Sequence, residues 1–222
     1  MEVNWKDRIG GIFYNKLDTK AIKYDTEESL SYATPFVQSK AMTNQCIYML
    51  KGMTNITMVE TCGGLGSDTM QFLTCKNISR IITTELNPLR YDAMTSNITI
   101  MKEAIKSSTP VEAINGNFIE YFYKNRDYLN KQKNIVSYID FPWGENYFED
   151  KNINENMTLN MFHPDNKLEK YNTSEIFDLV SGLNNVRMVI FKVPINHTLV
   201  ESKFISYTTI VKKHAKYIFI IL

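Results

Sequence analysis

The chain has 222 residues, of which 44% are hydrophobic and 12% aromatic, a composition typical of one well-buried globular domain. Its 25 Lys and Arg residues against 24 Asp and Glu give a net charge of +1, so no overall basic field indicates nucleic acid. The three cysteines form no C-x-x-C pair, which argues against a disulfide framework and against a zinc site. No segment approaches the roughly 20 apolar residues that span a bilayer. We therefore expect an intracellular protein of the nucleus or cytoplasm, with a viral origin left open, that is not secreted and has no membrane partner.

The first 33 residues mix charged and aromatic side chains without a clear period. We predict that residues 1–33 are an extension that packs on a larger domain, residues 34–222. Thr34 and Pro35 predict the start of a helix, with Thr34 as N-cap and Pro35 in the first helical position, and Gly52 predicts its end.

Strands and helices then alternate along the chain. Apolar runs predict strands over 56–61, 80–85, 111–117, 134–140 and 186–194, with helices over 68–73, 87–104 and 118–125 between the first four. Alternation of this kind implies right-handed crossovers and a mainly parallel sheet. Two further strands, 204–214 and 215–222, suggest an antiparallel hairpin at the sheet edge. The predicted fold class is α/β and Rossmann-like, with a seven-stranded, mainly parallel sheet, helices on both faces and an antiparallel edge strand.

One long polar insertion interrupts this order. Residues 145–173 are rich in Asn, Lys, Asp and Glu and directly follow the strand 134–140. A long insertion beside a candidate site is often a lid or substrate loop. A solvated surface loop is the alternative that stays open.

The turn after the first strand suggests a nucleoside cofactor. Glu60 ends that strand, and Gly64 and Gly66 let the backbone turn sharply before a helix that opens near Asp68. Dinucleotide enzymes seat a pyrophosphate on a similar turn, but two carboxylates here would repel it. The ammonium of the methionine moiety of S-adenosylmethionine fits Glu60 better.

Two later strand ends extend this cofactor hypothesis. Glu85 stands where a carboxylate can accept both ribose hydroxyls. In the segment NGNF, Asn117 is placed to read the adenine amino group and Phe118 to lie against the ring. A helix-start carboxylate at Glu85 and a simple turn at Asn117 remain open alternatives.

The segment Asp140-Phe141-Pro142-Trp143-Gly144 follows the strand 134–140. An acid and an aromatic residue that bracket a proline can hold a planar amino group against a methyl donor. No histidine has a partner pattern that indicates a metal site, so we expect no metal.

The order of these motifs resembles the class I S-adenosylmethionine-dependent amino-methyltransferases, whose D/N/S-P-P-W/Y/F tetrad corresponds to Asp140, Phe141, Pro142 and Trp143. A closer resemblance is to the trimethylguanosine synthases, which methylate the 2-amino group of guanosine in a 7-methylguanosine RNA cap. Four tracts carry it, KYDTEESLSYATPFVQSKAM, ETCGGLGSDTMQF, IDFPWGENY and VIFKVPIN, and together they extend over most of the chain.

The resemblance implies S-adenosylmethionine as cofactor, S-adenosylhomocysteine as product, and capped RNA or a cap nucleotide as the partner of an expected monomer. It adds further residues to the site. The cofactor set then includes Thr34, Cys62 and Thr69, the substrate set is Trp143, Lys192 and Asn196, and the catalytic set is Asp140, Phe141 and Pro142.

Three positions depart from the family pattern. Phe141 replaces the first proline of the tetrad, Asn117 replaces an aspartate, and Ile195 stands where an arginine helps to hold the cap. Two alternatives therefore stay open: a base amino-methyltransferase of ribosomal or transfer RNA, and a catalytically silent cap- or RNA-binding module.

Overall fold

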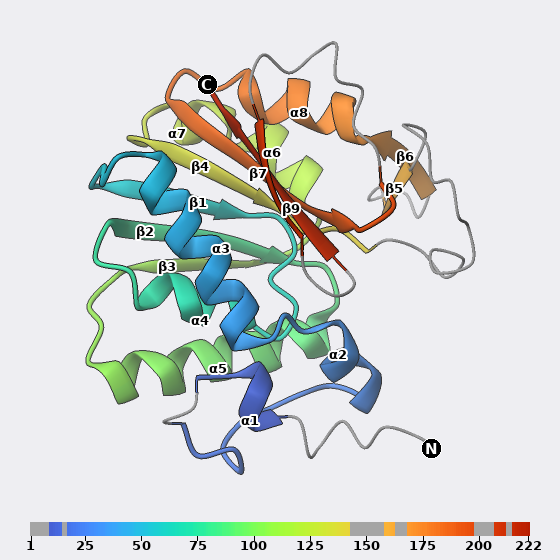
Figure 1. Ribbon diagram of the computed structural model, residues 1–222. Helices are drawn as coiled ribbons and strands as arrows, with labels where there is room; N and C mark the ends of the chain where they lie inside the picture. Colours follow the sequence, from blue (N-terminus) through green and yellow to red (C-terminus); the bar gives the residue numbers. More distant parts are fainter. Residues whose placement is uncertain (1–8, 15–16, 143–157, 163–167, 198–206, 212–214) are drawn as a thin grey trace. The chain divides into compact units, whose positions relative to one another are not determined.

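The computed structural model describes residues 9–14, 17–142, 158–162, 168–197, 207–211 and 215–222 (Figure 1). The chain divides into two compact units, Met1–Gly116 and Asn117–Leu222. Each unit is described by itself.

The first unit holds three parallel strands and five helices among its described residues. In chain order these are α1 (Ile9–Ile12), α2 (Glu27–Tyr32), α3 (Phe36–Met49), β1 (Ile56–Glu60), α4 (Ser67–Leu73), β2 (Ile78–Glu85), α5 (Pro88–Ile105) and β3 (Val111–Asn115). Strand β2 lies between β3 and β1 and pairs in parallel with both (Figure 1). Every residue of β1 is buried, as is typical of a parallel strand covered on both faces.

Local signals set the helix ends in this unit. Asn87 caps α5 by accepting from the backbone N–H groups of Leu89 (2.9 Å) and Arg90 (3.1 Å), and Pro88 occupies the first helical turn. The predicted N-cap of α3 is wrong by one residue. Pro35 takes that position and, having no polar side chain, makes no side-chain cap. The hydroxyl of Thr34 instead donates to Asp68 of the next helix.

The second unit contains four strands of the main sheet and a separate hairpin among its described residues. Its elements are α6 (Phe118–Lys124), α7 (Arg126–Asn130), β4 (Ile135–Ile139), β5 (Thr158–Phe162), β6 (Leu168–Asn172), α8 (Thr173–Ser181), β7 (Val186–Pro194), β8 (Tyr207–Val211) and β9 (Ala215–Ile221). Strands β4 and β7 are parallel, and β9 lies antiparallel between β7 and the edge strand β8.

The predicted fold class is confirmed: the chain has a Rossmann-like α/β fold whose sheet is mostly parallel with an antiparallel edge. Strands β5 and β6 form an antiparallel pair inside the insertion 145–173, and the lid function of this insertion stays a prediction. Among the helices that the structure describes, none is both long and apolar enough to cross a membrane.

Candidate functional site

Acidic side chains stand at the carboxyl ends of three strands. Glu60 ends β1 and Glu85 ends β2 in the first unit, and Asp140 directly follows β4 in the second unit. Ligands of open parallel α/β sheets bind outside the carboxyl ends of the strands. The sequence therefore places three candidate ligand-binding carboxylates where this fold class binds ligands.

In the first unit, hydrogen bonds join four of the predicted cofactor residues in pairs. The hydroxyl of Thr69 donates to the carboxylate of Glu60, which is only 1% exposed. The hydroxyl of Thr34 donates to Oδ2 of Asp68 over 2.6 Å, and both side chains are buried. The start of α4 is thus tied to the end of β1 and to the segment before α3.

The turn between β1 and α4 needs glycine for two reasons: one position has a left-handed backbone, and another has no space for a side chain. Gly66 is the N-cap of α4 and has a φ of 84°, in the left-handed region that favours glycine. Gly63 has no room for a side chain, because a Cβ there would lie 2.3 Å from Sδ of Met94 and 2.5 Å from Oγ1 of Thr83. The sequence prediction singled out Gly64 and Gly66 and missed Gly63, whose only signal is the Gly-Gly doublet.

Glu85 is held by the backbone around it. Its Oε2 accepts from the N–H of Gly64 (3.0 Å) and its Oε1 from the N–H of Asn87 (2.9 Å). Burial raises the pKa of Glu85, and these hydrogen bonds and the charge of Arg90 oppose that effect only in part. A carboxylate offers about four lone-pair sites, so each oxygen that accepts one backbone bond can still take a hydroxyl donor. This donor and acceptor chemistry fits a ribose diol.

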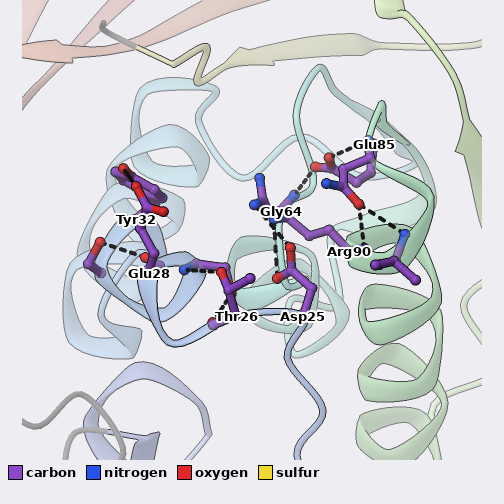
Figure 2. A network of polar contacts seen from close by, with 11 residues as sticks. Asp25, Thr26, Glu28, Tyr32, Gly64, Glu85 and Arg90 are labelled. Atoms are coloured by element: carbon purple, nitrogen blue, oxygen red, sulfur yellow. Dashed lines mark hydrogen bonds and ion pairs between the residues drawn. The ribbon is translucent and has the colours of Figure 1, made fainter. Parts of the chain in front are cut away.

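A second network, which the sequence prediction missed, lies beside Glu85. Figure 2 shows Arg90 reaching from α5 to Asp25, with Nη2 3.1 Å from Oδ2 and Nε 3.4 Å from Oδ1. Burial alone would raise the pKa of Asp25, but hydrogen bonds from Ser29 and Arg90 and the charge of Arg90 together lower it. The pair joins residues 65 positions apart, a separation that no local sequence pattern could indicate.

Asn97 ties the N-terminal segment to the glycine turn. Its side chain accepts from the N–H of Lys23 (2.8 Å) and donates to the carbonyls of Lys23 (2.9 Å) and Leu65 (3.0 Å). Asn97 is fully buried, so a side chain that lost these partners would leave polar groups unsatisfied. The segment around Lys23 and the cofactor turn are therefore held by one residue of α5.

In the second unit, Asn117 and Phe118 make structural contacts. These contacts use the atoms that the predicted adenine contacts would need. The side-chain oxygen of Asn117 caps α6 by accepting from the N–H groups of Ile119 (2.8 Å) and Glu120 (3.4 Å). That oxygen is the atom that would have to accept from the adenine amino group. Phe118 is 2% exposed and packs against the rings of Phe122 (5.9 Å) and Phe141 (6.3 Å between centroids).

The three described residues of the predicted catalytic segment differ in their exposure. Asp140 is half-buried, Phe141 is 2% exposed, and Pro142 is exposed. Phe141 packs against Phe118, so the ring in the place of the first tetrad proline anchors the segment to the interior. Trp143 and the next residues lie outside the described part of the chain.

Lys192 of β7 forms an ion pair with Asp140, with Nζ 2.6 Å from Oδ2. Its side chain is only 8% exposed. The structure thus joins a predicted substrate residue to a predicted catalytic residue inside one unit. Asn196 is half-buried just after β7, and Cys62 is half-buried in the glycine turn of the first unit. No group of three or more His, Cys, Asp or Glu side chains suited to a metal ion occurs among the described residues.

Comparisons with known proteins bear on the fold. No family model matches the chain, and no curated protein matches it. A solved structure from Porphyromonas gingivalis, described as a "putative methyltransferase", aligns over 90% of this chain and 44% of its own length, with 14% identity and a TM-score of 0.60. This chain therefore spans less than half the length of that protein. At such an identity the match shows the shared fold alone.

Two other solved structures align at lower TM-scores. A "putative methylase" from Haemophilus influenzae covers 82% of this chain and 88% of its own, with 14% identity and a TM-score of 0.48. TrmK of M. capricolum, in complex with S-adenosyl-homocysteine, covers 84% of this chain and 66% of its own, with 10% identity and a TM-score of 0.46. At these TM-scores the two structures add nothing to the fold assignment.

Proposed function

We propose that the chain is an S-adenosylmethionine-dependent methyltransferase that acts on the exocyclic 2-amino group of guanosine in a 7-methylguanosine RNA cap. The observation that carries the proposal is the set of carboxylates at strand ends: Glu60 and Glu85 in the first unit and Asp140 in the second. Capped RNA, or a cap nucleotide, is the partner that the proposal includes.

The first unit supplies the donor set for the cofactor. Glu60, supported by Thr69, offers a carboxylate to the ammonium of the methionine moiety. Glu85 keeps lone pairs for two ribose hydroxyls beside its backbone bonds. When bound, S-adenosylmethionine supplies a methyl group that its sulfonium makes electrophilic, a reaction that needs no metal.

The second unit supplies the groups that orient the substrate. A guanine amino group is a poor nucleophile because its lone pair is delocalised into the ring, and alignment is therefore the main contribution of the protein. Asp140 accepts one N–H of the amino group and a backbone carbonyl of the same segment accepts the other. Alignment of this kind supplies ~7 to 11 kcal/mol in favourable systems. The proton that the nitrogen loses passes to water after the transfer.

Trp143 gives the proposal its cap specificity. A 7-methylguanine base is cationic, and an indole face attracts such a cation by roughly 0.5 to 2 kcal/mol. This part of the proposal rests on the resemblance to the trimethylguanosine synthases, since the tryptophan stands in the matching tetrad position.

Transfer of a labelled methyl group to 7-methyl-GDP tests the proposal. We expect activity with 7-methyl-GDP, loss of it in Asp140→Ala, and a raised KM for 7-methyl-GDP in Trp143→Ala. Binding of S-adenosylhomocysteine, measured by calorimetry, is expected to survive both substitutions because neither Asp140 nor Trp143 belongs to the predicted cofactor residues. Activity that neither substitution changes would refute this mechanism, and no cofactor binding at all would favour a silent RNA-binding module.

A second candidate is methylation of an uncharged guanine or adenine amino group in a larger RNA. One observation favours it: Lys192 pairs with Asp140 and neutralises its charge. The segment Asp140-Phe141-Pro142, which we call the amino-group clamp, therefore has no net negative charge that would prefer a cationic base. Competition between 7-methyl-GDP and GDP separates the two candidates. The cap enzyme requires the methylated base, whereas the RNA base enzyme does not discriminate between these nucleotides.

A further inference from the structure

The ion pair between Asp140 and Lys192 links the predicted catalytic acid to a lysine of the neighbouring strand. Their charged atoms lie 2.6 Å apart, and the side chains are 17% and 8% exposed. Such a short contact between ionised groups is a charge-assisted hydrogen bond, which is stronger and more directional than a neutral one. The pair is therefore a partly buried, directional contact rather than an ion pair of the open surface.

The register of the sheet explains why the two residues meet. Strands β4 and β7 pair in parallel, and Ile139 lies opposite Phe191. Asp140 and Lys192 follow these two residues directly. The backbone of both strands thus fixes the positions from which the carboxylate and the ammonium group reach each other.

The low exposure of Lys192 argues against a phosphate-binding role. An ammonium group that serves cap phosphates is expected to be accessible, whereas this side chain is 8% exposed and already contacts a carboxylate. Moving it to a phosphate would leave the charge of Asp140 without this counter-charge in a partly buried place. The contact is therefore better explained as a fixed part of the clamp.

We propose that Lys192 is a positioning residue, which holds the Asp140 carboxylate oriented so that it accepts an N–H of the substrate amino group. This inference rests on the proposed methyltransferase function. Lys192 engages Oδ2 of Asp140, and we infer that this contact limits the rotation of the carboxylate group. A carboxylate that turns away from the amino group would lose the alignment on which the proposed catalysis depends.

The test compares Lys192→Met and Lys192→Arg with the unaltered chain on three substrates: 7-methylguanosine, its diphosphate and its triphosphate. Because a misplacement of about 1 Å can lower a rate about 100-fold, we expect kcat to fall on the order of 10- to 100-fold in Lys192→Met. The fall is expected to be the same for all three substrates, with KM nearly unchanged. Lys192→Arg keeps the charge and the hydrogen bond, and it is expected to restore part of kcat.

Lys216 of β9 provides a matched control. It is also a partly buried lysine of the same sheet, and it lies opposite Val193, the residue after Lys192. Lys216→Met removes the same charge without touching the pair, and its kcat is expected to stay near that of the unaltered chain. A general effect of lost positive charge would lower kcat in both variants and would overturn the inference.

Three further outcomes decide the matter. A KM that rises with the number of substrate phosphates while kcat is unchanged would make Lys192 a phosphate ligand and refute the positioning role. If Lys192→Met does not fold, it is replaced by the double variant Asp140→Asn with Lys192→Met, which removes both charges together. The kcat of this double variant should equal that of Asp140→Asn alone. A further loss of kcat in the double variant would refute the inference. An unaltered chain that binds S-adenosylhomocysteine but methylates none of the substrates would overturn the proposed function, and this inference with it.

Discussion

Acidification is expected to destabilise the second unit through one buried histidine. His197 is 0% exposed, its Nε2 lies 3.1 Å from Oγ1 of Thr173, and burial, with a smaller effect of the charge of Lys216, lowers the pKa of His197 from 6.5 to about 4. Between these two pH values the unfolded chain binds a proton that the folded chain excludes. The free energy of unfolding therefore keeps the full contribution of His197 above pH 6.5 and loses it as the pH falls toward 4.

The size of this loss follows from the same two values. Each pH unit changes the free energy of unfolding by about 1.4 kcal/mol for one proton, so the interval corresponds to about 3 kcal/mol. That amount is a large part of the stability of an ordinary domain, which is about 5 to 15 kcal/mol. His197 is thus expected to be a main contributor to acid sensitivity in this unit.

Urea unfolding of the unaltered chain and of His197→Gln, at a series of pH values between about 4 and 7.5, measures the effect. Glutamine can keep a hydrogen bond to Thr173 but does not titrate. Carboxylates affect both proteins alike, so the difference between their unfolding free energies should shrink, or change sign, as the pH falls from 6.5 to 4. A difference that is constant over this interval would refute the assignment of a depressed pKa to His197.

Three further predictions concern the first unit. Because burial raises the pKa of Glu85, affinity for S-adenosylhomocysteine should weaken as the pH falls toward that pKa, and calorimetry should find weak binding to Glu85→Gln at every pH. Gly63→Ala should lower the free energy of unfolding by about 1 to 3 kcal/mol through overpacking, whereas Gly116→Ala, whose nearest new contact is at 3.9 Å, should change it little. Asp25→Ala should lower it by about 1 to 3 kcal/mol and speed hydrogen exchange in residues 21–34, and the exposed Asp18→Ala should do neither. If Gly116→Ala lowered the free energy of unfolding as much as Gly63→Ala, the overpacking prediction would be contradicted. Equal effects of Asp18→Ala and Asp25→Ala would contradict the prediction for Asp25.

The sheet could be predicted because parallel strands that are buried on both faces consist largely of apolar residues, which are recognisable in the sequence. Strands β1 and β4 are short, fully buried and mostly apolar, and β2 is buried over its last five residues. Each ends in an acid or is followed directly by one, and these local patterns need no distant partner to be recognised. The fold class and the strand-end acids were accessible for this reason. Helix α2 was not, because its six residues lie in a stretch whose hydrophobic pattern has no period.

Contacts between distant residues account for the rest. Thr34 has the residue type and the following proline of a helix cap, yet its hydroxyl binds Asp68, 34 positions away. Arg90 and Asn97 look like ordinary surface positions of α5, but they hold Asp25 and Lys23. In each case a tertiary partner, which has no local signature, determines what the side chain does.

Phe141 shows how a departure from a family motif can be compensated by packing. A proline in this position would limit the backbone by its ring, which fixes φ without any partner. The phenylalanine instead inserts a ring that is 2% exposed next to Phe118, itself next to Phe122. The segment then depends on an aromatic cluster for its rigidity, while Lys192 constrains Asp140 from the neighbouring strand. Both constraints act on the residues that precede Trp143, so the substitution of the tetrad proline does not by itself argue against a functional amino-group clamp.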